Sequence, residues 1–445
     1  MRLITRLSIS LAIGGLACAA ADQVVDADAV KQWLTKDAIP LKTVEAGHGF
    51  DDLKPLKKVL RNVHLVGLGE ATHGSREFFQ MKHRMLEFLV REMGFTVFAI
   101  EASYPACWNI NDYVLYGKGD RAKALASQGF WTWDTNEVSD MIDWMRAYNE
   151  KAPENKKVKF LGYDLQNFSR TYEVINAYLN KVAPEYVPTA EDAFNDLKLP
   201  ASEYGKRPDE QRKQETARIL ELLGFLGLHE TEFVRKTSQS EFDEAMQEAR
   251  ILAEYDEAYG QNPAKPGRNL RDFYMAENIA YLVNQQPAGT KMVIWAHNGH
   301  IQTTAYGGGV PSMGSHLRKM YGDSYYAFGF TLYEGGLQSR EMKPTGAGGL
   351  KEFTLPPAPE GSVGWYFNLP GISKYIVDLR AAPKEGPVAE FLSMPHPMTS
   401  VGSGFNTSWT TKQYMAPTVL KDAFDGIIFI KKTTRARPNP TGMRS

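Results

Sequence analysis

The chain has 445 residues, of which 43% are hydrophobic and 23% are charged, and its formal net charge at pH 7 is −1. This composition is ordinary for a globular protein with a large hydrophobic core. A net charge near zero, without a long basic stretch, excludes nucleic acid as an expected partner.

The first segment, residues 1–21, is predicted to be a signal peptide. Arg2 and Arg6 flank the start of an apolar run that ends near Cys18, where small residues follow with A-x-A spacing. This run is shorter than the ~20 residues that span a bilayer, so it predicts export rather than a stable membrane anchor. The mature chain, 22–445, is therefore expected in the periplasm or outside the cell.

The next elements form a strand–helix–strand unit. A strand is predicted at the start of 63–74, followed by a helix over 75–93 whose apolar residues recur on one face, with Gly94 just past its end. Another strand follows over 96–104. Right-handed crossover connections make two such strands parallel, so we expect their carboxyl ends at the same edge of a sheet. Cys107, just beyond this unit, is predicted to be a small buried residue rather than a nucleophile.

A second helix is predicted over 136–149, with Asn136 as its cap, and it leads into a strand over 158–164. Residues 209–259 then contain no proline and many good helix formers. We interpret them as the centre of a helical insertion, residues 170–265, within one α/β domain.

The chain is predicted to return to the sheet through a helix over 268–285. Four further strands are expected, over 291–301, 324–333, 375–380 and 426–431. The stretch 334–370 is rich in glycine and proline and is predicted to form loops with short strands. The predicted fold class is α/β: a mostly parallel central sheet flanked by helices, with the helical insertion and a C-terminal α+β portion.

Acid and histidine residues stand at the ends of four predicted strands. The carboxyl ends of parallel strands lie along one edge of a sheet, and ligands bind in the crevice at that edge. A group of carboxylates and imidazoles at one edge is what acid–base or metal chemistry requires. The residues expected to converge there are Glu70, His73, Glu101, Asp164, His297 and His300.

Five of these residues are candidates for catalysis. In GEATHG, Glu70 can hydrogen-bond one imidazole nitrogen of His73, which raises the basicity of the other nitrogen. His73 would then take a proton from water; the alternative is a helix-capping glutamate beside a structural histidine. His297 and His300 flank a turn and suit either metal ligation or an acid or oxyanion role. Glu101 can orient His73 or His300, or share the activation of water.

Other residues near this edge are candidates for substrate binding. Lys82 and Arg271 can hold an anionic intermediate or pair with the site carboxylates, with a solvated charge as a further alternative for Lys82. Tyr104 and Trp133 can form an apolar wall, and the loop that carries His316 is expected to overhang the same edge. The full set of candidates is Lys82, Tyr104, Trp133, Asp164, Arg271 and His316, of which Asp164 can instead hold an arginine or a neighbouring loop.

Taken together, four segments resemble the erythromycin esterase family over about residues 40–430: GEATHGSREFFQMKHRMLEFL, FTVFAIEASY, MAENIAYL and WAHNGHI. The resemblance implies hydrolysis of a carboxylic or cyclic ester, such as a macrolactone, by activated water, without a covalent acyl-enzyme and without a cofactor. The expected partner is a small-molecule ester. The sequence agrees, because it contains no G-x-S-x-G nucleophile elbow.

The resemblance also assigns roles to residues. It places the general base of the family on His73 and the partner carboxylate on Glu70. The strand-end glutamate falls on Glu101, and the later histidine pair falls on His297 and His300. Members that confer macrolide resistance usually carry an arginine where this chain has a lysine at position 82, and lysine lacks the planar two-pronged donor geometry of arginine.

Two alternatives remain open from the residues alone. In a metal-dependent hydrolase, Glu70, His73, His297 and His300 would hold a metal ion, and a bound water would be the nucleophile. In an exported binding protein, the same crevice would hold a ligand without turnover.

Overall fold

The structure is a computed structural model that describes residues 25–168, 170–194, 197, 199, 201–260, 270–343 and 346–439. The predicted signal peptide lies outside these ranges, and so do the first two residues of the helix predicted over 268–285. None of the helices in the described ranges is long and apolar enough to cross a membrane.

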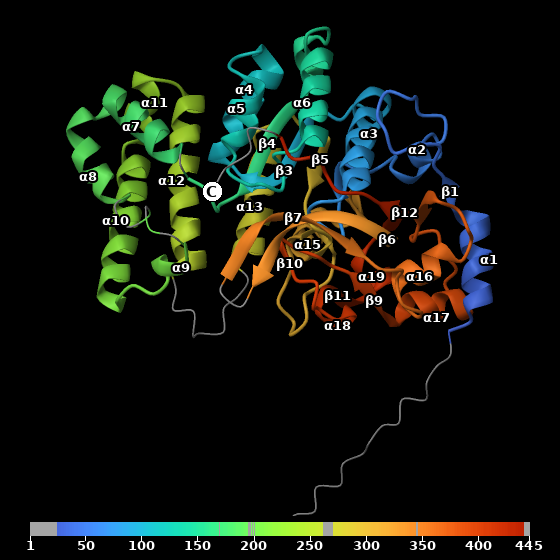
Figure 1. Ribbon diagram of the computed structural model, residues 1–445. Coiled ribbons are helices and arrows are strands. Elements are labelled where there is room, and N and C mark those ends of the chain that lie inside the picture. The colour runs from blue at the N-terminus through green and yellow to red at the C-terminus, as the bar shows by residue number, and fades with distance from the viewer. Residues whose placement is uncertain are drawn as a thin grey trace, which may run out of the picture.

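A ten-stranded sheet forms the centre of the molecule, with the strand order β1-β8-β12-β6-β2-β5-β3-β4 and with β7 and β10 paired to β6 (Figure 1). The six neighbours from β12 to β4 run parallel, whereas β8, β1 and β7 pair antiparallel. The α/β prediction with a mostly parallel sheet is therefore confirmed. The strands of this sheet are β1 (Ile39–Pro40), β2 (Leu65–Leu68), β3 (Val97–Ser103), β4 (Lys159–Asp164), β5 (Met292–Trp295), β6 (Tyr325–Lys343), β7 (Gly346–Leu355), β8 (Lys374–Asp378), β10 (Gly404–Phe405) and β12 (Gly426–Thr433).

The register of three central strands brings their carboxyl ends level with one another. Leu68 of β2 pairs with Trp295 of β5, which in turn pairs with Ile100 of β3. The residues that follow these three positions therefore leave the sheet at the same height. This register is the physical reason for the convergence of segments that are far apart in the sequence.

Helices cover both faces of the sheet because successive strand residues point to opposite sides. In β5, Met292 and Ile294 belong to one hydrophobic core, and Val293 and Trp295 belong to the other. Helices α3 and α6 pack on the Trp295 side, and α13 and α15 pack on the opposite side. The helices around the sheet are α1 (Ala27–Asp37), α2 (Leu56–Val59), α3 (Arg76–Met93), α4 (Trp108–Tyr116), α5 (Arg121–Ala126), α6 (Asn136–Asn149), α13 (Leu270–Asn284), α14 (Asn298–Ile301), α15 (Met313–Tyr321), α16 (Val363–Asn368), α17 (Pro387–Ser393), α18 (Thr411–Tyr414) and α19 (Leu420–Ala423).

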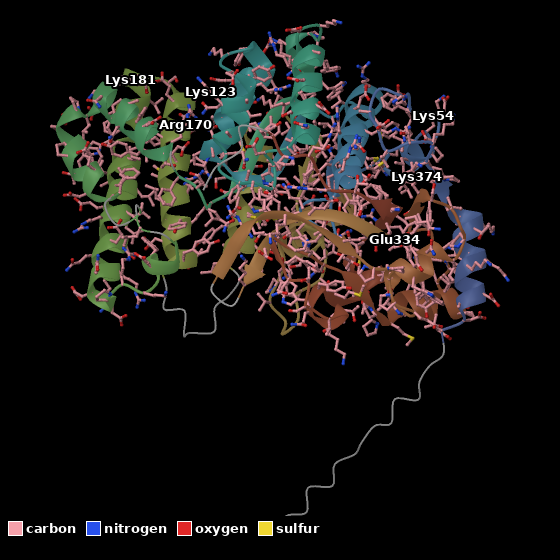
Figure 2. All side chains as sticks on the ribbon, viewed as in Figure 1. Lys54, Lys123, Arg170, Lys181, Glu334 and Lys374 are labelled. Carbon is pink, nitrogen blue, oxygen red and sulfur yellow. The ribbon has the colours of Figure 1, made fainter. Side chains whose placement is uncertain are left out.

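Between β4 and α13 the chain forms a block of helices beside the sheet (Figure 1). Its helix α12 packs against α7 and α10 within the block and against α13 of the sheet layer. Figure 2 shows charged side chains such as Lys181 on the outside of this block. The helices are α7 (Thr171–Val182), α8 (Val187–Asp192), α9 (Ala201–Tyr204), α10 (Asp209–Leu228), α11 (Glu230–Lys236) and α12 (Gln239–Tyr259).

Two local predictions were wrong. Helix α6 begins at Asn136, but its cap is the preceding Thr135, whose hydroxyl accepts a hydrogen bond from the backbone N–H of Val138. The stretch 334–370 is not mainly loop, because β6 continues to Lys343 and forms a long hairpin with β7. Glycine weakens the strand pattern in a sequence, and the hydrogen bonds to a neighbouring strand outweigh that weakness here.

A separate two-stranded sheet, β9 (Pro395–Thr399) with β11 (Met415–Val419), completes the C-terminal portion.

Candidate active site

Glu70 and His73 lie on the connection between β2 and α3, directly beyond the carboxyl end of β2. Nδ1 of His73 lies 2.6 Å from Oε1 of Glu70. The other oxygen of Glu70 accepts hydrogen bonds from Nζ of Lys82 at 2.6 Å and from Nε1 of Trp295 at 2.8 Å. Because a carboxylate can only accept, His73 carries its proton on Nδ1 and leaves Nε2 as an acceptor.

Two glycines allow this connection to lie tightly against its neighbours. A Cβ atom at Gly69 would collide with the side chain of Asn298, and one at Gly74 would collide with the backbone of Gln338. Between them, the backbone of Ala71 accepts a hydrogen bond from Val401 at 2.8 Å. The G-E-A-T-H-G spacing is therefore a packing requirement that fixes where Glu70 and His73 point.

Lys82 is fully buried, which contradicts the alternative of a solvated charge and also removes it from direct substrate contact. Its Nζ lies 4.2 Å from the ring centroid of Trp295 as well as beside Glu70. Burial lowers the pKa of Lys82 to about 8, although the neighbouring Glu70 opposes this change. The sequence held a signal for this position, since Lys82 follows Phe78 by four residues and precedes Met85 by three, on the apolar face of α3.

His297 follows β5, and its ring is held as a neutral imidazole. The backbone N–H of Gly299 donates to Nδ1 of His297 at 3.2 Å, so the ring proton resides on Nε2. Burial, with His73 and His300 nearby, holds the pKa of His297 well below its usual value. Nε2 is buried and has no hydrogen-bond partner within the described part of the chain. The rings of His73 and His297 have centroids 5.0 Å apart, so the imidazole that offers an acceptor and the imidazole that offers a donor are neighbours.

His300 lies in an ion-pair cluster with two carboxylates. Its Nδ1 is 2.9 Å from Asp272 and its Nε2 is 3.2 Å from Oε1 of Glu101. Burial alone would lower the pKa of His300, but Asp272 and Glu101 outweigh it and raise this pKa to about 10. The hydroxyl of Tyr306 donates to the second oxygen of Asp272 at 2.9 Å. At neutral pH His300 is therefore a cation.

Arg271 joins this cluster to the end of β4. Its guanidinium donates to both oxygens of Asp164, at 3.1 and 2.8 Å, and to Glu101 at 2.8 Å. Burial alone would raise the pKa of Glu101, but His300 and Arg271 hold it well below its usual range. Nη1 of Arg271 also lies 3.2 Å from Nε2 of His300, and the carboxylates of Glu101 and Asp164 offset the contact between these two cations.

Three further residues proposed for substrate binding do not line the cavity at the histidines. Asp164 is fully buried and holds Arg271, as its alternative interpretation expected. Tyr104 packs edge-on against Trp108 and does not line the cavity at the histidines. His316 packs against Phe273 on α13 and does not line the cavity at the histidines.

A cavity of about 410 Å³ opens where these groups meet. This volume is within the range of small-molecule sites. Trp133 forms part of its wall; its indole N–H donates to the backbone oxygen of Glu101 at 2.9 Å, and its ring lies edge-on to His73. The lining residues are His73, Glu101, Phe130, Thr132, Trp133, Gln166, Arg271, His297, His300, Gly402 and Ser403.

Several residues in and around this cavity are not predicted from the sequence. Gly402 and Ser403 reach the cavity because Val401 pairs with Thr72, a long-range contact without a local signal. Asp272 could have been found from its place next to Arg271, since a helix facing a histidine-bearing turn is a natural source of a counter-ion. Trp295 could have been found as the last residue of its strand, two places before His297.

In the part of the chain that the structure describes, no group of three or more histidine, cysteine, aspartate or glutamate residues is arranged to hold a metal ion. Both oxygens of Glu70, which would have to coordinate a metal ion, already accept hydrogen bonds from His73, Lys82 and Trp295. A role for Glu70 as a metal ligand is therefore not supported by its contacts.

With this geometry established, comparisons with known proteins identify the family. Residues 90–433 match the model of the erythromycin esterase family. The chain belongs to the erythromycin esterase family. It is accordingly a hydrolase of ester bonds that acts on a small-molecule substrate. The matched range begins after Glu70 and His73, so the placement of these two residues in the site rests on the contacts described above.

Relatives of similar length support this assignment. Erythromycin esterase type II of Escherichia coli is 25% identical, in an alignment that covers 91% of this chain and 98% of that protein. The putative hydrolase YbfO of Bacillus subtilis is also 25% identical, over 97% and 98% of the two chains.

Solved structures agree in fold. A crystal structure of a Bacillus cereus protein superposes with a TM-score of 0.82 at 27% identity, and the match covers 93% of this chain and 99% of that one. A mutant of the erythromycin esterase EreC in its open conformation gives a TM-score of 0.68 at 16% identity, over 89% and 96% of the chains.

Proposed function

We propose that this esterase hydrolyses its substrate with a water molecule that His73 activates, without a covalent acyl-enzyme. The observation that carries this proposal is the hydrogen bond between Nδ1 of His73 and Glu70, which leaves Nε2 as a base at the cavity wall. His73 takes one proton from water as the oxygen attacks the ester carbonyl. The same proton then passes to the alkoxide that leaves, and His73 returns to its neutral form.

The negative charge that develops on the carbonyl oxygen requires donors. His297 offers the N–H of a neutral ring, and the absence of a partner for its Nε2 among the described residues supports this role. A donor that is already in place when charge develops stabilises a transition state without reorganisation. The cationic His300 and Arg271 line the same cavity and add positive charge to it.

The chemistry of the wall indicates the substrate class. Phe130 and Trp133 contribute apolar surface to the wall, and Glu101, Arg271 and the three histidines contribute polar and charged groups. An uncharged carboxylic ester fits such a cavity, and a macrolactone is the cyclic form that the family name suggests. Hydrolysis of macrolides, and with it antibiotic resistance, is the specific form of this proposal.

The test uses purified protein with para-nitrophenyl acetate and with a macrolide, in ¹⁸O-labelled water and with a chelator. We expect one labelled oxygen in the acid product, and a macrolide product heavier by one water. Rapidly quenched enzyme should keep its unmodified mass. An acyl adduct on the protein would contradict direct attack by water, and loss of activity with the chelator would replace this proposal with the metal-dependent one.

Export is part of the proposal, and it rests on the sequence of residues 1–21. Fractionation of cells that express the full chain should place the protein in the periplasm or the medium. The exported protein should begin near residue 22. A cytoplasmic protein that retains its first residues would contradict export.

A further inference from the structure

A second cavity, of about 380 Å³, lies against the α14 turn between the two site histidines. Its lining is mostly apolar, with Met398, Pro417, Val419 and Phe424 contributed by the C-terminal portion. Asp422 is the one charged residue among the described residues that line it. Such a lining favours an uncharged hydrocarbon ligand over a polar one.

The same two pieces of chain border both cavities. Along α14 and the residue before it, His297 and His300 line the catalytic cavity, whereas Asn298 and Gly299 line the second one. Along the segment 400–403, Ser400 lines the second cavity, whereas its last two residues line the catalytic one. A ligand in the second cavity therefore lies next to the residues that surround the reacting carbonyl.

Tyr306 connects the second cavity with the ion-pair cluster. Its ring lines the cavity, and its hydroxyl donates to Asp272 at 2.9 Å and lies 3.0 Å from Nδ1 of His300. An occupant of the cavity would thus contact a side chain that holds the counter-ion of His300. Tyr306 thus belongs both to the lining of the second cavity and to the ion-pair cluster of the catalytic one.

We propose that the second cavity binds an aliphatic chain of the ester substrate while the ester group lies at His73 and His297. This inference rests on the proposed esterase function and specifies its substrate class: esters with an extended aliphatic portion. Transfer of one methylene group from water to an apolar cavity corresponds to about a fourfold gain in affinity. The selectivity should therefore grow with chain length until the cavity is filled.

The experiment measures kcat/KM for para-nitrophenyl esters from acetate to decanoate. In the wild-type protein kcat/KM should rise by about fourfold per methylene over the first additions. Ala416→Trp and Ala305→Trp place a large ring in the cavity from two separate segments of its lining. Both variants should flatten the series, because they should lower kcat/KM more for the long esters than for acetate. Lys421→Trp is the matched control, because Lys421 is exposed on the neighbouring helix and does not line the cavity.

A flat series in the wild-type protein would overturn the inference, and so would equal losses on all esters in the two filled variants. Calorimetric titration with decanol tests the cavity without turnover. Decanol should bind to the wild type and to Lys421→Trp but not to the filled variants. If no ester is hydrolysed and decanol still binds in this pattern, the esterase mechanism fails and the cavity assignment stands. Absence of decanol binding to the wild type would contradict the assignment.

Discussion

At the residue scale, the hydrogen-bond and ion-pair partners of the site histidines fix the protonation of each ring. The Gly299 N–H fixes the tautomer of His297, Glu70 fixes that of His73, and two carboxylates keep His300 protonated. Three histidines in one cavity thus have three different states: His297 is a donor, His73 is an acceptor and His300 is a cation. The residue type alone could not have distinguished them, because the difference lies in their neighbours.

The role of His297 predicts the effect of its replacement. His297→Ala should lower kcat by about 10²–10³ with little change in KM, because it removes a donor that acts on the developing charge. His297→Gln is the matched variant, since its terminal amide can place an N–H near the position of Nε2. Steady-state kinetics should show that the Gln variant keeps more activity than the Ala variant. Equal activity of the two would contradict the donor role.

The burial of Lys82 predicts a coupled loss of stability and activity. Lys82→Met leaves the buried Glu70 without its cation, and breaking such a pair costs about 3–5 kcal/mol of unfolding free energy. Lys82→Arg keeps the charge and serves as control. The free energy of unfolding, measured with a denaturant, and kcat should both be lower in the Met variant than in the wild type. Both should be less affected in the Arg variant. A Met variant as stable and active as the wild type would show that Glu70 does not need this cation.

At the element scale, the site depends on the level ends of β2, β3 and β5 and on helix α13, which delivers Arg271 and Asp272. The α14–α15 connection adds Tyr306.

Tyr306→Phe keeps the ring and removes the hydroxyl that donates to Asp272. Hydrogen bonds to charged groups are worth about 1.5–3 kcal/mol, so we expect kcat/KM to fall about tenfold or more. An unchanged kcat/KM would show that this hydroxyl does not position the cluster.

The convergence of the site was predictable because it follows from local patterns. Each strand is a short apolar run that ends on an acid or a histidine. Parallel pairing then brings these strand ends to the same edge of the sheet. The partners of those residues were less predictable. For Lys82 the sequence allows both a solvated charge and a pair with a site carboxylate, and only the packing of α3 selects the buried pair with Glu70. Tyr104 is predicted to form part of an apolar wall, but its ring packs against Trp108 and does not line the catalytic cavity. Gly402 and Ser403 depend on a long-range strand contact that no local pattern reports.

At the scale of the whole molecule, the cation His300 of the ion-pair cluster links stability to pH. The pKa of His300 rises from 6.5 to about 10 on folding. The folded state therefore holds this proton more tightly, and its stabilisation is fully present below about pH 6.5 and is lost as the pH rises towards 10. The difference in unfolding free energy between the wild type and His300→Gln should shrink over that window. A difference that stays constant from pH 6 to about 10 would contradict a cationic His300.

The site is assembled by several layers of the molecule. The sheet supplies level strand ends, helix α13 supplies the counter-charges, and the C-terminal portion closes the cavity wall through Val401. Residues from across the chain must fold together before His73 has its cavity. A reporter of activity is therefore also a reporter of the intact fold.

The central claim is that His73 is the base that activates water in a metal-free ester hydrolysis. It is tested most directly by the rate of para-nitrophenyl acetate hydrolysis, in the presence of a chelator, by the wild type and by His73→Ala of equal thermal stability. The account predicts an active wild type and a loss of about 10²–10⁴ in kcat for the variant. A variant that retains the wild-type rate would contradict it, as would a wild type that the chelator inactivates and added metal restores.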